Sequence, residues 1–338
     1  MSRVRVQRSG LLTTVQDLGR TGHQHEGVPV SGAMDRAALR LANLLVGNAE
    51  GEAALEVTLH GPVLELEGDV LLSITGADLS ASLDDRPLAL DRAVHAPAGA
   101  RLTFGRPVTG CRAYLAFAGG IAVPPALGSR ATYVRAGLGG LGGRALALGD
   151  LLPLGEPTEW SRRLAASIPL RRTAPWGPAP RQLARTGEDI EVRALPGAHF
   201  GALAPESKAA LLADAGNPHS AAGWFVVTGE SDRMGYRLDG PSLALAQALE
   251  LVSEPVAFGT VQLPPGGKPI VLMADRQTTG GYPRVLEAIG VDLTLLAQAA
   301  PGTRVRFRET SLEEAQRLYL ARAQRRSRLA LAISLQLH

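Results

Sequence analysis

The 338-residue chain is poor in cysteine and in aromatic residues. Cys111 is the single cysteine, which excludes an internal disulfide and a thiolate metal cluster. It lies in the apolar run TGCRAYLAFAGG, where a buried small residue is expected. Aromatic residues make up 4% of the chain, whereas Gly (39) and Pro (23) are abundant. Many turns and few long helices are therefore expected, which favours a mainly β fold.

Long hydrophobic runs and dense clusters of one charge are also missing. The first residues, MSRVRVQRSG, lack the apolar core of a signal peptide, and no run reaches the length of a membrane span. The net charge is +3, and the basic residues are scattered arginines apart from an Arg-rich tail that is typical of a solvated helix face. We therefore expect a cytoplasmic, soluble protein that binds neither nucleic acid nor membranes.

Length and strand rhythm predict two domains, because 338 residues exceed what one core usually covers. Short runs bounded by Gly, Pro and Asp are typical of a sandwich or barrel. We predict a β-rich domain at 1–165, a Pro-rich linker at 166–190, a second domain at 191–310 and a basic helical tail at 311–338. The run GARLTF at 99–104 is echoed by GTRVRF, which favours a duplication with the site between two barrels.

One helix is predicted over the stretch SGAMDRAALRLANLLVGN, which starts at Ser31. Apolar residues recur there at helical spacing, and Asn43 falls on the opposite, polar side. Ser31 is a plausible N-cap, Asp35 lies in the first turn, and Gly47 suits the position after the helix.

Two motifs in the sequence are set aside. Gly137-x-Gly139-x-x-Gly142 has the spacing of a dinucleotide fingerprint, but no buried strand precedes it and no helix follows, so a flexible loop is predicted. His23 and His25 lack a third ligand nearby, so no metal site is predicted.

Polar, Gly-flanked loops carry the candidate chemistry. GESDRMGYRLDGP (229–241) and MADRQTTGGYPR (273–284) each set an Asp-Arg pair beside Gly and Tyr, and QDLGR adds Asp17 and Arg20. Asp can accept a proton, Arg can clamp a carboxylate or phosphate, and hydroxyls with backbone N–H groups can hold an oxyanion. An ordinary surface Asp-Arg pair is the alternative for either loop. The predicted catalytic residues are Asp232, Arg233, Asp275 and Arg276. The predicted substrate-binding residues are Asp17, Arg20, Ser31, Asp35, Tyr236, Thr278, Thr279, Gly280 and Tyr282.

Several of these stretches together resemble a known family. TTVQDLGRTGHQHEGVPVSGAMD, SDRMGYRLDGP and SEPVAFGTVQLPPGGKPIVLMADRQTTGGYPRV are similar to the KipA, or biotin-dependent carboxyltransferase, family, also called the allophanate hydrolase subunit 2 family. The resemblance covers roughly residues 3–310. It implies two cyclophilin-like β-barrel domains.

The resemblance also implies a function. Many members look like the C subunit of an ATP-dependent 5-oxoprolinase, which opens 5-oxoproline to glutamate. On that reading the chain is one component of an ATP-dependent amidohydrolase, active only together with KipI-like and LamB/YcsF-like subunits. No nucleotide motif is present, so ATP is expected at a subunit interface or on a partner.

Two alternatives stay open. Related domains serve as carboxyltransferases that act on urea or other amides with carboxybiotin. No biotin-acceptor segment is present, so biotin would have to be carried by another protein. A third reading is a regulator that binds a KipI-like protein, for which aromatic anchors would be expected. Tyr236 and Tyr282 are the candidates for such anchors.

Overall fold

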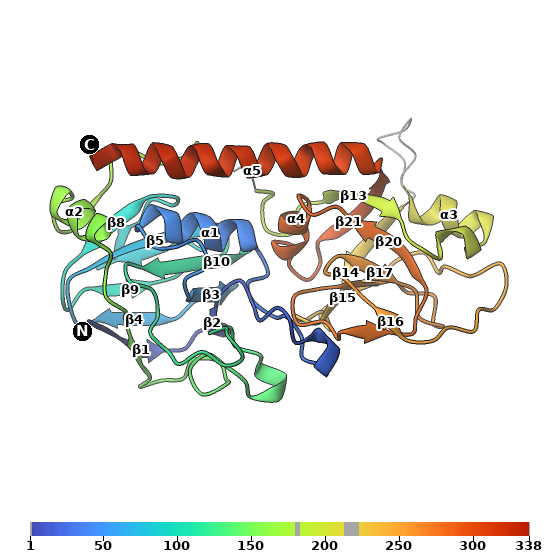
Figure 1. Ribbon diagram of the computed structural model, residues 1–338, viewed down its shortest axis with the longest axis horizontal. Coiled ribbons are helices and arrows are strands. Elements are labelled where there is room, and N and C mark those ends of the chain that lie inside the picture. Colours follow the sequence, from blue (N-terminus) through green and yellow to red (C-terminus); the bar gives the residue numbers. More distant parts are fainter. Residues whose placement is uncertain (1, 180–182, 213–222, 338) are drawn as a thin grey trace. The chain divides into compact units, whose positions relative to one another are not determined.

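A computed structural model describes residues 2–179, 183–212 and 223–337 (Figure 1). The chain divides into two compact units. Unit 1 consists of Met1–Arg20, Ser31–Leu183 and Arg325–His338, and unit 2 of Thr21–Val30 and Ala184–Gln324. Strands dominate both units, so the prediction of a mainly β fold is confirmed.

Unit 1 contains two six-stranded sheets. The first has the order β11-β1-β4-β9-β6-β7, formed by Leu151–Pro153, Arg3–Arg8, Val63–Leu66, Arg101–Thr103, Ser82–Leu83 and Arg86–Pro87. The second has the order β12-β8-β5-β10-β3-β2, formed by Arg172–Thr173, Ala93–Ala96, Val70–Asp78, Thr109–Phe117, Ala54–Thr58 and Leu12–Gln16. Alternating apolar side chains of both sheets, such as Val4, Leu64, Leu72 and Leu115, form one core between them.

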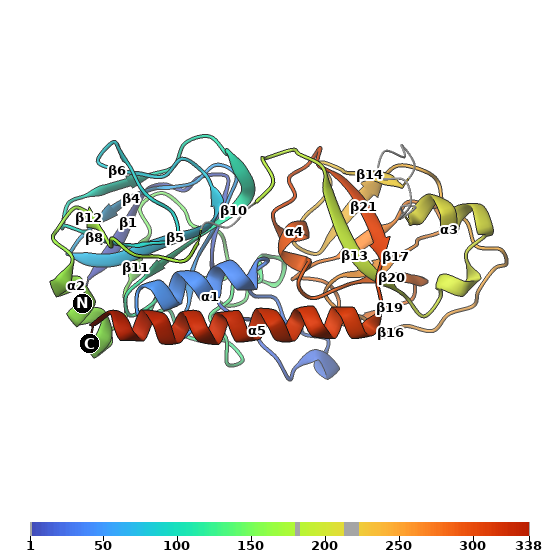
Figure 2. The same cartoon turned by 90° about the horizontal axis from the view of Figure 1, so that it is seen from above.

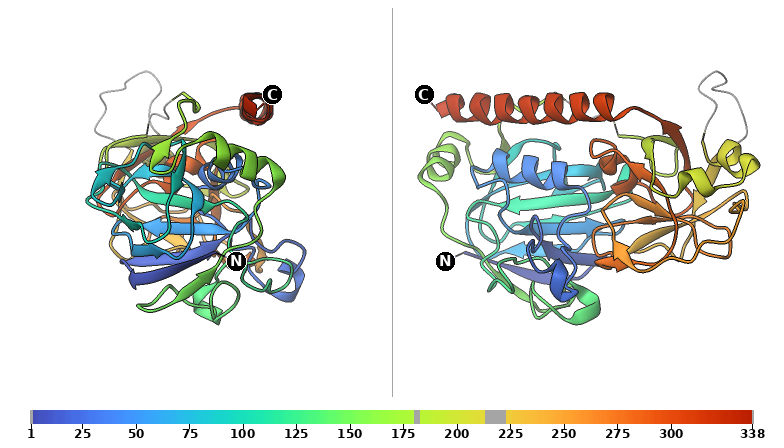
Figure 3. Two further views of the ribbon diagram at one scale, coloured as in Figure 1. Left: turned by 90° about the vertical axis from the view of Figure 1, so that its left-hand side faces the viewer. Right: turned by 45° about the vertical axis from the view of Figure 1, so that its right-hand side comes forward.

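Helix α1 (Arg36–Leu45) covers the outer face of the second sheet (Figure 3). The prediction of Ser31 as its N-cap is wrong. Asp35 occupies that position, because its Oδ1 accepts the N–H groups of Ala37 (3.1 Å) and Ala38 (3.0 Å). Asn43 is buried rather than on a polar face, and its amide donates to the Glu52 carbonyl at 2.8 Å.

Unit 2 is built on a closed barrel. Its order is β13-β20-β17-β18-β15-β14-β21, formed by Ile190–Pro196, Arg284–Ala288, Thr260–Gln262, Ile270–Leu272, Gly235–Asp239, Trp224–Val227 and Arg304–Glu309. Strand β13 pairs in parallel with β21, and the other barrel pairs are antiparallel. Two short strands, β16 (Glu254–Pro255) and β19 (Thr279–Gly280), form a separate two-stranded sheet.

The remaining helical segments are short, except for the last α-helix. They are η1 (Gln24–Glu26), η2 (Val134–Ala136), α2 (Glu159–Ser167), η3 (Phe200–Ala202), α3 (Pro205–Leu211), α4 (Leu293–Ala297), α5 (Leu312–Ser334) and η4 (Leu335–Leu337). No helix in the described part of the chain is long and apolar enough to cross a membrane.

Helix α5 is the predicted basic tail (Figure 2). In unit 1, Leu329 and Ile333 of this helix pack against Leu41 and Leu45 of α1. In unit 2, the Arg322 guanidinium donates to the carbonyl oxygens at residues 290 and 291 (2.9 and 3.3 Å).

Part of the segment predicted as a linker at 166–190 packs in unit 1. Ile168 and Ala174 are buried in its core, and β12 pairs with β8. Apolar side chains among the prolines explain this, because their burial stabilises the segment against the sheet. Residues 180–182 of this segment lie outside the described residues.

Candidate functional site

The two Asp-Arg loops of unit 2 lie next to each other. The turn at 229–234 leads into β15, and β18 leads into the loop at 273–283. Because β15 and β18 are antiparallel neighbours, with Gly235 opposite Leu272, both loops emerge at the same edge of the barrel. Two backbone hydrogen bonds, from Met273 N–H to Met234 O (2.9 Å) and from Asp275 N–H to Arg233 O (2.8 Å), continue the pairing.

Arg233 and Asp275 form a bidentate ion pair at this edge. The Arg233 Nε lies 2.9 Å from Asp275 Oδ2, and Nη2 lies 3.0 Å from Oδ1. Both side chains are about nine-tenths buried, at 7% and 6% exposure. The ion pair therefore joins the two loops, and each of its buried charges compensates the other.

The other predicted residues of these loops differ in exposure. Asp232 is exposed, and its Oδ1 accepts the N–H groups of Met234 (2.8 Å) and Gly235 (3.2 Å), which makes it a turn-forming residue. Tyr236 is buried in the barrel at 2% exposure. Tyr282 is 46% exposed, and Thr279 is exposed on β19.

Arg276 is half-buried beside the segment that precedes β17. Its Nε donates to the Val256 carbonyl at 3.3 Å, and its guanidinium lies 6.0 Å from the centre of the Phe258 ring. The Val256 N–H in turn donates to the Thr278 carbonyl at 3.1 Å. The loop after Asp275 is thus fixed over residues 256–258.

A polar patch under the loop at 273–283 was not predicted from the sequence. Thr260 and Gln262 are both buried at 1% exposure on β17, where the alternation with Val261 is the signal that could have revealed them. The Gln262 amide lies 3.4 Å from both the Tyr282 carbonyl and the Gln277 amide. Gly280 allows this approach, because a Cβ there would lie 2.5 Å from Gln262 Nε2.

Glu287 completes this patch from β20. It stands opposite Thr260 in the β17–β20 register, and the Thr260 hydroxyl donates to its Oε2 at 2.7 Å. Burial raises the pKa of the Glu287 carboxyl above its ordinary value, against the lowering effects of Thr260 and Arg284.

In unit 1, three predicted residues are gathered around the loop at 126–132. Asp17 accepts from Gly19 N–H (2.7 Å), Ser129 Oγ–H (2.6 Å) and Arg130 N–H (2.6 Å). The buried Arg20 guanidinium donates to the Ala126 and Ala131 carbonyl oxygens. Ser31, at a left-handed φ of 56°, donates to the Thr132 carbonyl at 3.3 Å. All three side chains serve to fix this loop.

The predicted flexible loop with the Gly137-x-Gly139-x-x-Gly142 pattern lies beside it. It follows η2 and contains turns rather than strand or helix. Gly139 has φ +71°, and a Cβ there would lie 2.1 Å from the Ala131 carbonyl oxygen and 2.8 Å from Arg20 Nη2. The glycine is therefore needed for close packing.

Asp35 belongs to a second buried network in unit 1 that the sequence did not reveal. The Tyr114 hydroxyl donates to Glu56 Oε2 at 2.7 Å and accepts the Asp35 N–H at 2.6 Å. Glu56 Oε2 also accepts the Met34 N–H at 2.9 Å. Burial raises the pKa of Tyr114 well above its ordinary value, so the phenol stays protonated as the donor.

Cys111, as predicted, is buried.

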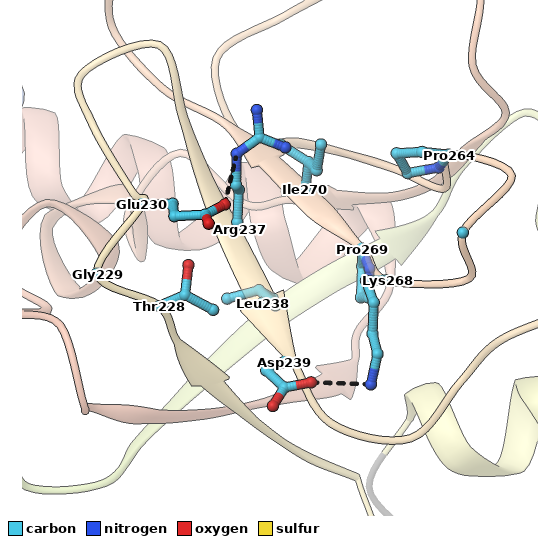
Figure 4. A pocket seen from close by; sticks show the side chains of 11 residues that line it. Thr228, Gly229, Glu230, Arg237, Leu238, Asp239, Pro264, Lys268, Pro269 and Ile270 are labelled. Atoms are coloured by element: carbon cyan, nitrogen blue, oxygen red, sulfur yellow. Dashed lines mark ion pairs between the residues drawn. The ribbon is translucent and has the colours of Figure 1, made fainter.

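One hollow of about 580 Å³ opens on unit 2 beside β15 and β18 (Figure 4). Ile270 is among its lining residues, and the charged lining residues form two ion pairs, Arg237 with Glu230 (3.8 Å) and Lys268 with Asp239 (2.8 Å). These four side chains are 47–83% exposed. None of the predicted site residues lines this hollow. The predicted residues of the two Asp-Arg loops gather instead at the barrel edge, which with Arg276 and the polar patch forms the candidate site.

Fold and loops together define a protein with one β-sandwich unit and one β-barrel unit, in which two polar loops meet at the barrel edge. The family description "Carboxyltransferase domain, subdomain A and B" matches residues 26–309. The chain belongs to this carboxyltransferase-domain family.

The chain is similar to proteins of two kinds, a 5-oxoprolinase subunit and a urea carboxylase. The chain is 41% identical over 312 residues to the C subunit of 5-oxoprolinase from Escherichia coli, covering 92% of this chain and 93% of the relative. The crystal structure of TTHA0988 has a TM-score of 0.74 at 35% identity, covering 92% of this chain and 56% of that one. The crystal structure of Kluyveromyces lactis urea carboxylase has a TM-score of 0.84 at 29% identity, covering 97% of this chain and 29% of that one.

Proposed function

We propose that the chain is the C subunit of an ATP-dependent 5-oxoprolinase, which opens 5-oxoproline to glutamate. The observation that carries the proposal is the match to the Escherichia coli 5-oxoprolinase component, which extends along 92% of this chain and 93% of the relative. The urea carboxylase reading is supported less well, because the chain corresponds to 29% of that enzyme.

In this proposal the enzyme works as a complex. Its partners are a KipI-like protein and a LamB/YcsF-like protein, and ATP binds at a subunit interface or on a partner. Arg276 serves as the cation that binds the substrate carboxylate or the transferred phosphoryl group. The Arg233–Asp275 pair holds its loop, because both charges already compensate one another at 2.9 Å.

Phosphate release by the three mixed proteins, with and without 5-oxoproline, tests the proposed function. We expect release that requires 5-oxoproline and all three proteins. If no combination responds to 5-oxoproline while urea with a carboxybiotin donor is turned over, the carboxyltransferase reading replaces it.

Substitution of Arg276 tests its role in that complex. Arg276→Ala should lower 5-oxoproline turnover by about 100-fold, the usual scale for losing one preorganised electrostatic contact. Its hydrogen bonds to the Val256 and Met273 carbonyl oxygens are long (3.3 and 3.4 Å), so the loss of these two bonds should change the unfolding free energy by less than about 1 kcal/mol. Unchanged turnover would remove Arg276 from the mechanism. Arg237→Ala, beside the hollow, is the matched control.

A further inference from the structure

Glu287 differs from the other carboxylates of unit 2. The other buried or half-buried carboxylates described there each pair with an arginine. These are Glu191 with Arg306 and Arg308, Glu254 with Arg284, Asp275 with Arg233, Asp292 with Arg193, and Glu314 with Arg317. Glu287 is half-buried as well, yet among the described residues no cation lies within ion-pair distance of it. Arg284, whose charge lowers the Glu287 pKa, pairs with Glu254 instead. A carboxyl group in this setting is costly to ionise, which makes Glu287 a candidate functional group.

The hydrogen bonds around Glu287 decide which oxygen can carry a proton. The Thr260 hydroxyl accepts the Ala257 N–H at 3.1 Å and donates to Glu287 Oε2 at 2.7 Å. Because Oε2 is the acceptor, a proton on the carboxyl group belongs on Oε1. Among the described residues, Oε1 has no hydrogen-bond partner, and the side chain is partly open to solvent. Oε1 can therefore reach a small ligand.

Glu287 and Arg276 are anchored to neighbouring residues of one segment. Arg276 donates to the Val256 carbonyl, and the next residue, Ala257, donates its N–H to the Thr260 hydroxyl that holds Glu287. The same short segment thus contacts a cation of the loop at 273–283 and the hydroxyl that holds the Glu287 carboxyl group. A cation and an acid are the two groups needed to hold an anionic amide and to protonate its leaving nitrogen.

We propose that Glu287 is the general acid of this site and that its Oε1–H protonates the amide nitrogen that leaves when the lactam ring opens. This inference rests on the proposed function. Opening a lactam with a nucleoside triphosphate and water yields a carboxylate, an amine, nucleoside diphosphate and phosphate. As the C–N bond breaks, its electron pair moves to nitrogen, which takes the proton from Oε1. Solvent water then reprotonates the Glu287 carboxylate.

The experiment compares Glu287→Gln with wild type in the assembled three-protein complex, measured as 5-oxoproline-dependent phosphate release. Gln keeps an oxygen for the Thr260 hydroxyl but carries no acidic proton. We expect kcat to fall by about 100-fold or more, on the scale of general acid catalysis, with a smaller change in KM. Wild-type kcat should fall as the pH rises through the Glu287 pKa, and this limb should be absent in the variant. Glu191→Gln removes a half-buried carboxylate that pairs with Arg306 and Arg308 and should keep the limb.

Thr260→Val is a second variant with a different signature. The Thr260 hydrogen bond lowers the Glu287 pKa, so its loss should move the limb to higher pH without abolishing turnover. If Glu287→Gln stays within about threefold of wild type and keeps the limb, Glu287 is not the acid. A wild-type complex that shows no response to 5-oxoproline would instead overturn the proposed function, and this inference with it. That result is distinct from a variant that is active and unaffected, which overturns the role of Glu287 alone.

Discussion

The polar loops of the two units use the same residue types in different ways. Around 126–132 in unit 1, Asp17, Arg20 and Ser31 are buried, and each is engaged with backbone groups or with Ser129. At the barrel edge of unit 2, Arg233 and Asp275 are likewise buried and engaged, whereas Arg276, which bonds the Val256 carbonyl, and Glu287, which accepts from Thr260, are only half-buried. Buried polar residues build a loop, whereas polar residues that stay partly open to solvent can meet a substrate.

Breaking the Arg233–Asp275 ion pair of unit 2 should cause the largest loss of stability. Arg233→Ala leaves the Asp275 carboxylate buried without its cation, which should lower the unfolding free energy by about 3–5 kcal/mol. Denaturant unfolding of the single chain measures this. The double variant Arg233→Met/Asp275→Leu removes both charges and should recover most of the loss. A single variant as stable as wild type would show that the pair does not brace the loops.

These charges illustrate what the sequence could and could not predict. The Asp-Arg motifs marked both loops, but local order alone suggested Asp232 with Arg233 and Asp275 with Arg276. The structure pairs Arg233 with Asp275 across the β15–β18 neighbours, 42 residues apart. A contact of that kind depends on strand pairing, which single-sequence patterns do not specify.

The fold shows the same division between local and non-local information. The helix from residue 36 follows from its apolar spacing, and Asp35 rather than Ser31 caps it because the chain turns at a left-handed Ser31. The alternation in β17 could have marked Thr260 and Gln262, but Glu56 and Glu287 lie in strands whose neighbours decide their surroundings. The burial of Glu56 and the half-burial of Glu287 could therefore not be read locally.

The loop at 126–132 of unit 1 should show the next largest loss of unfolding free energy. Asp17→Ala removes the acceptor of three hydrogen bonds and leaves the Arg130 N–H and Ser129 hydroxyl without it, for a loss of about 2–3 kcal/mol. Thermal unfolding checks this. Asp17→Asn keeps an oxygen acceptor and should lose less. If Asp17→Ala lowers turnover at a temperature where it remains fully folded, the loop has a role beyond scaffolding.

Helix capping should contribute a smaller amount. Asp35→Ala removes the cap of α1 and should cost about 1 kcal/mol. Thr158→Ala is the matched control, because Thr158 caps the short helix α2 through Ser161 N–H at 3.0 Å and its loss should cost less. Equal losses of unfolding free energy in the two variants would mean that the buried position of α1 adds nothing to the contribution of its cap.

The smallest effect should be a pH-dependent one at Glu287. Its folded pKa is raised by burial, so the folded state favours the protonated carboxyl group. Its contribution to stability is therefore complete below the unfolded pKa and is lost as the pH rises through the folded pKa. Glu287→Gln cannot ionise, so its stability relative to wild type should increase with pH across that window. Denaturant unfolding of both proteins at matched pH values measures the difference, and a constant difference would mean that Glu287 ionises as easily in the folded chain as in the unfolded one.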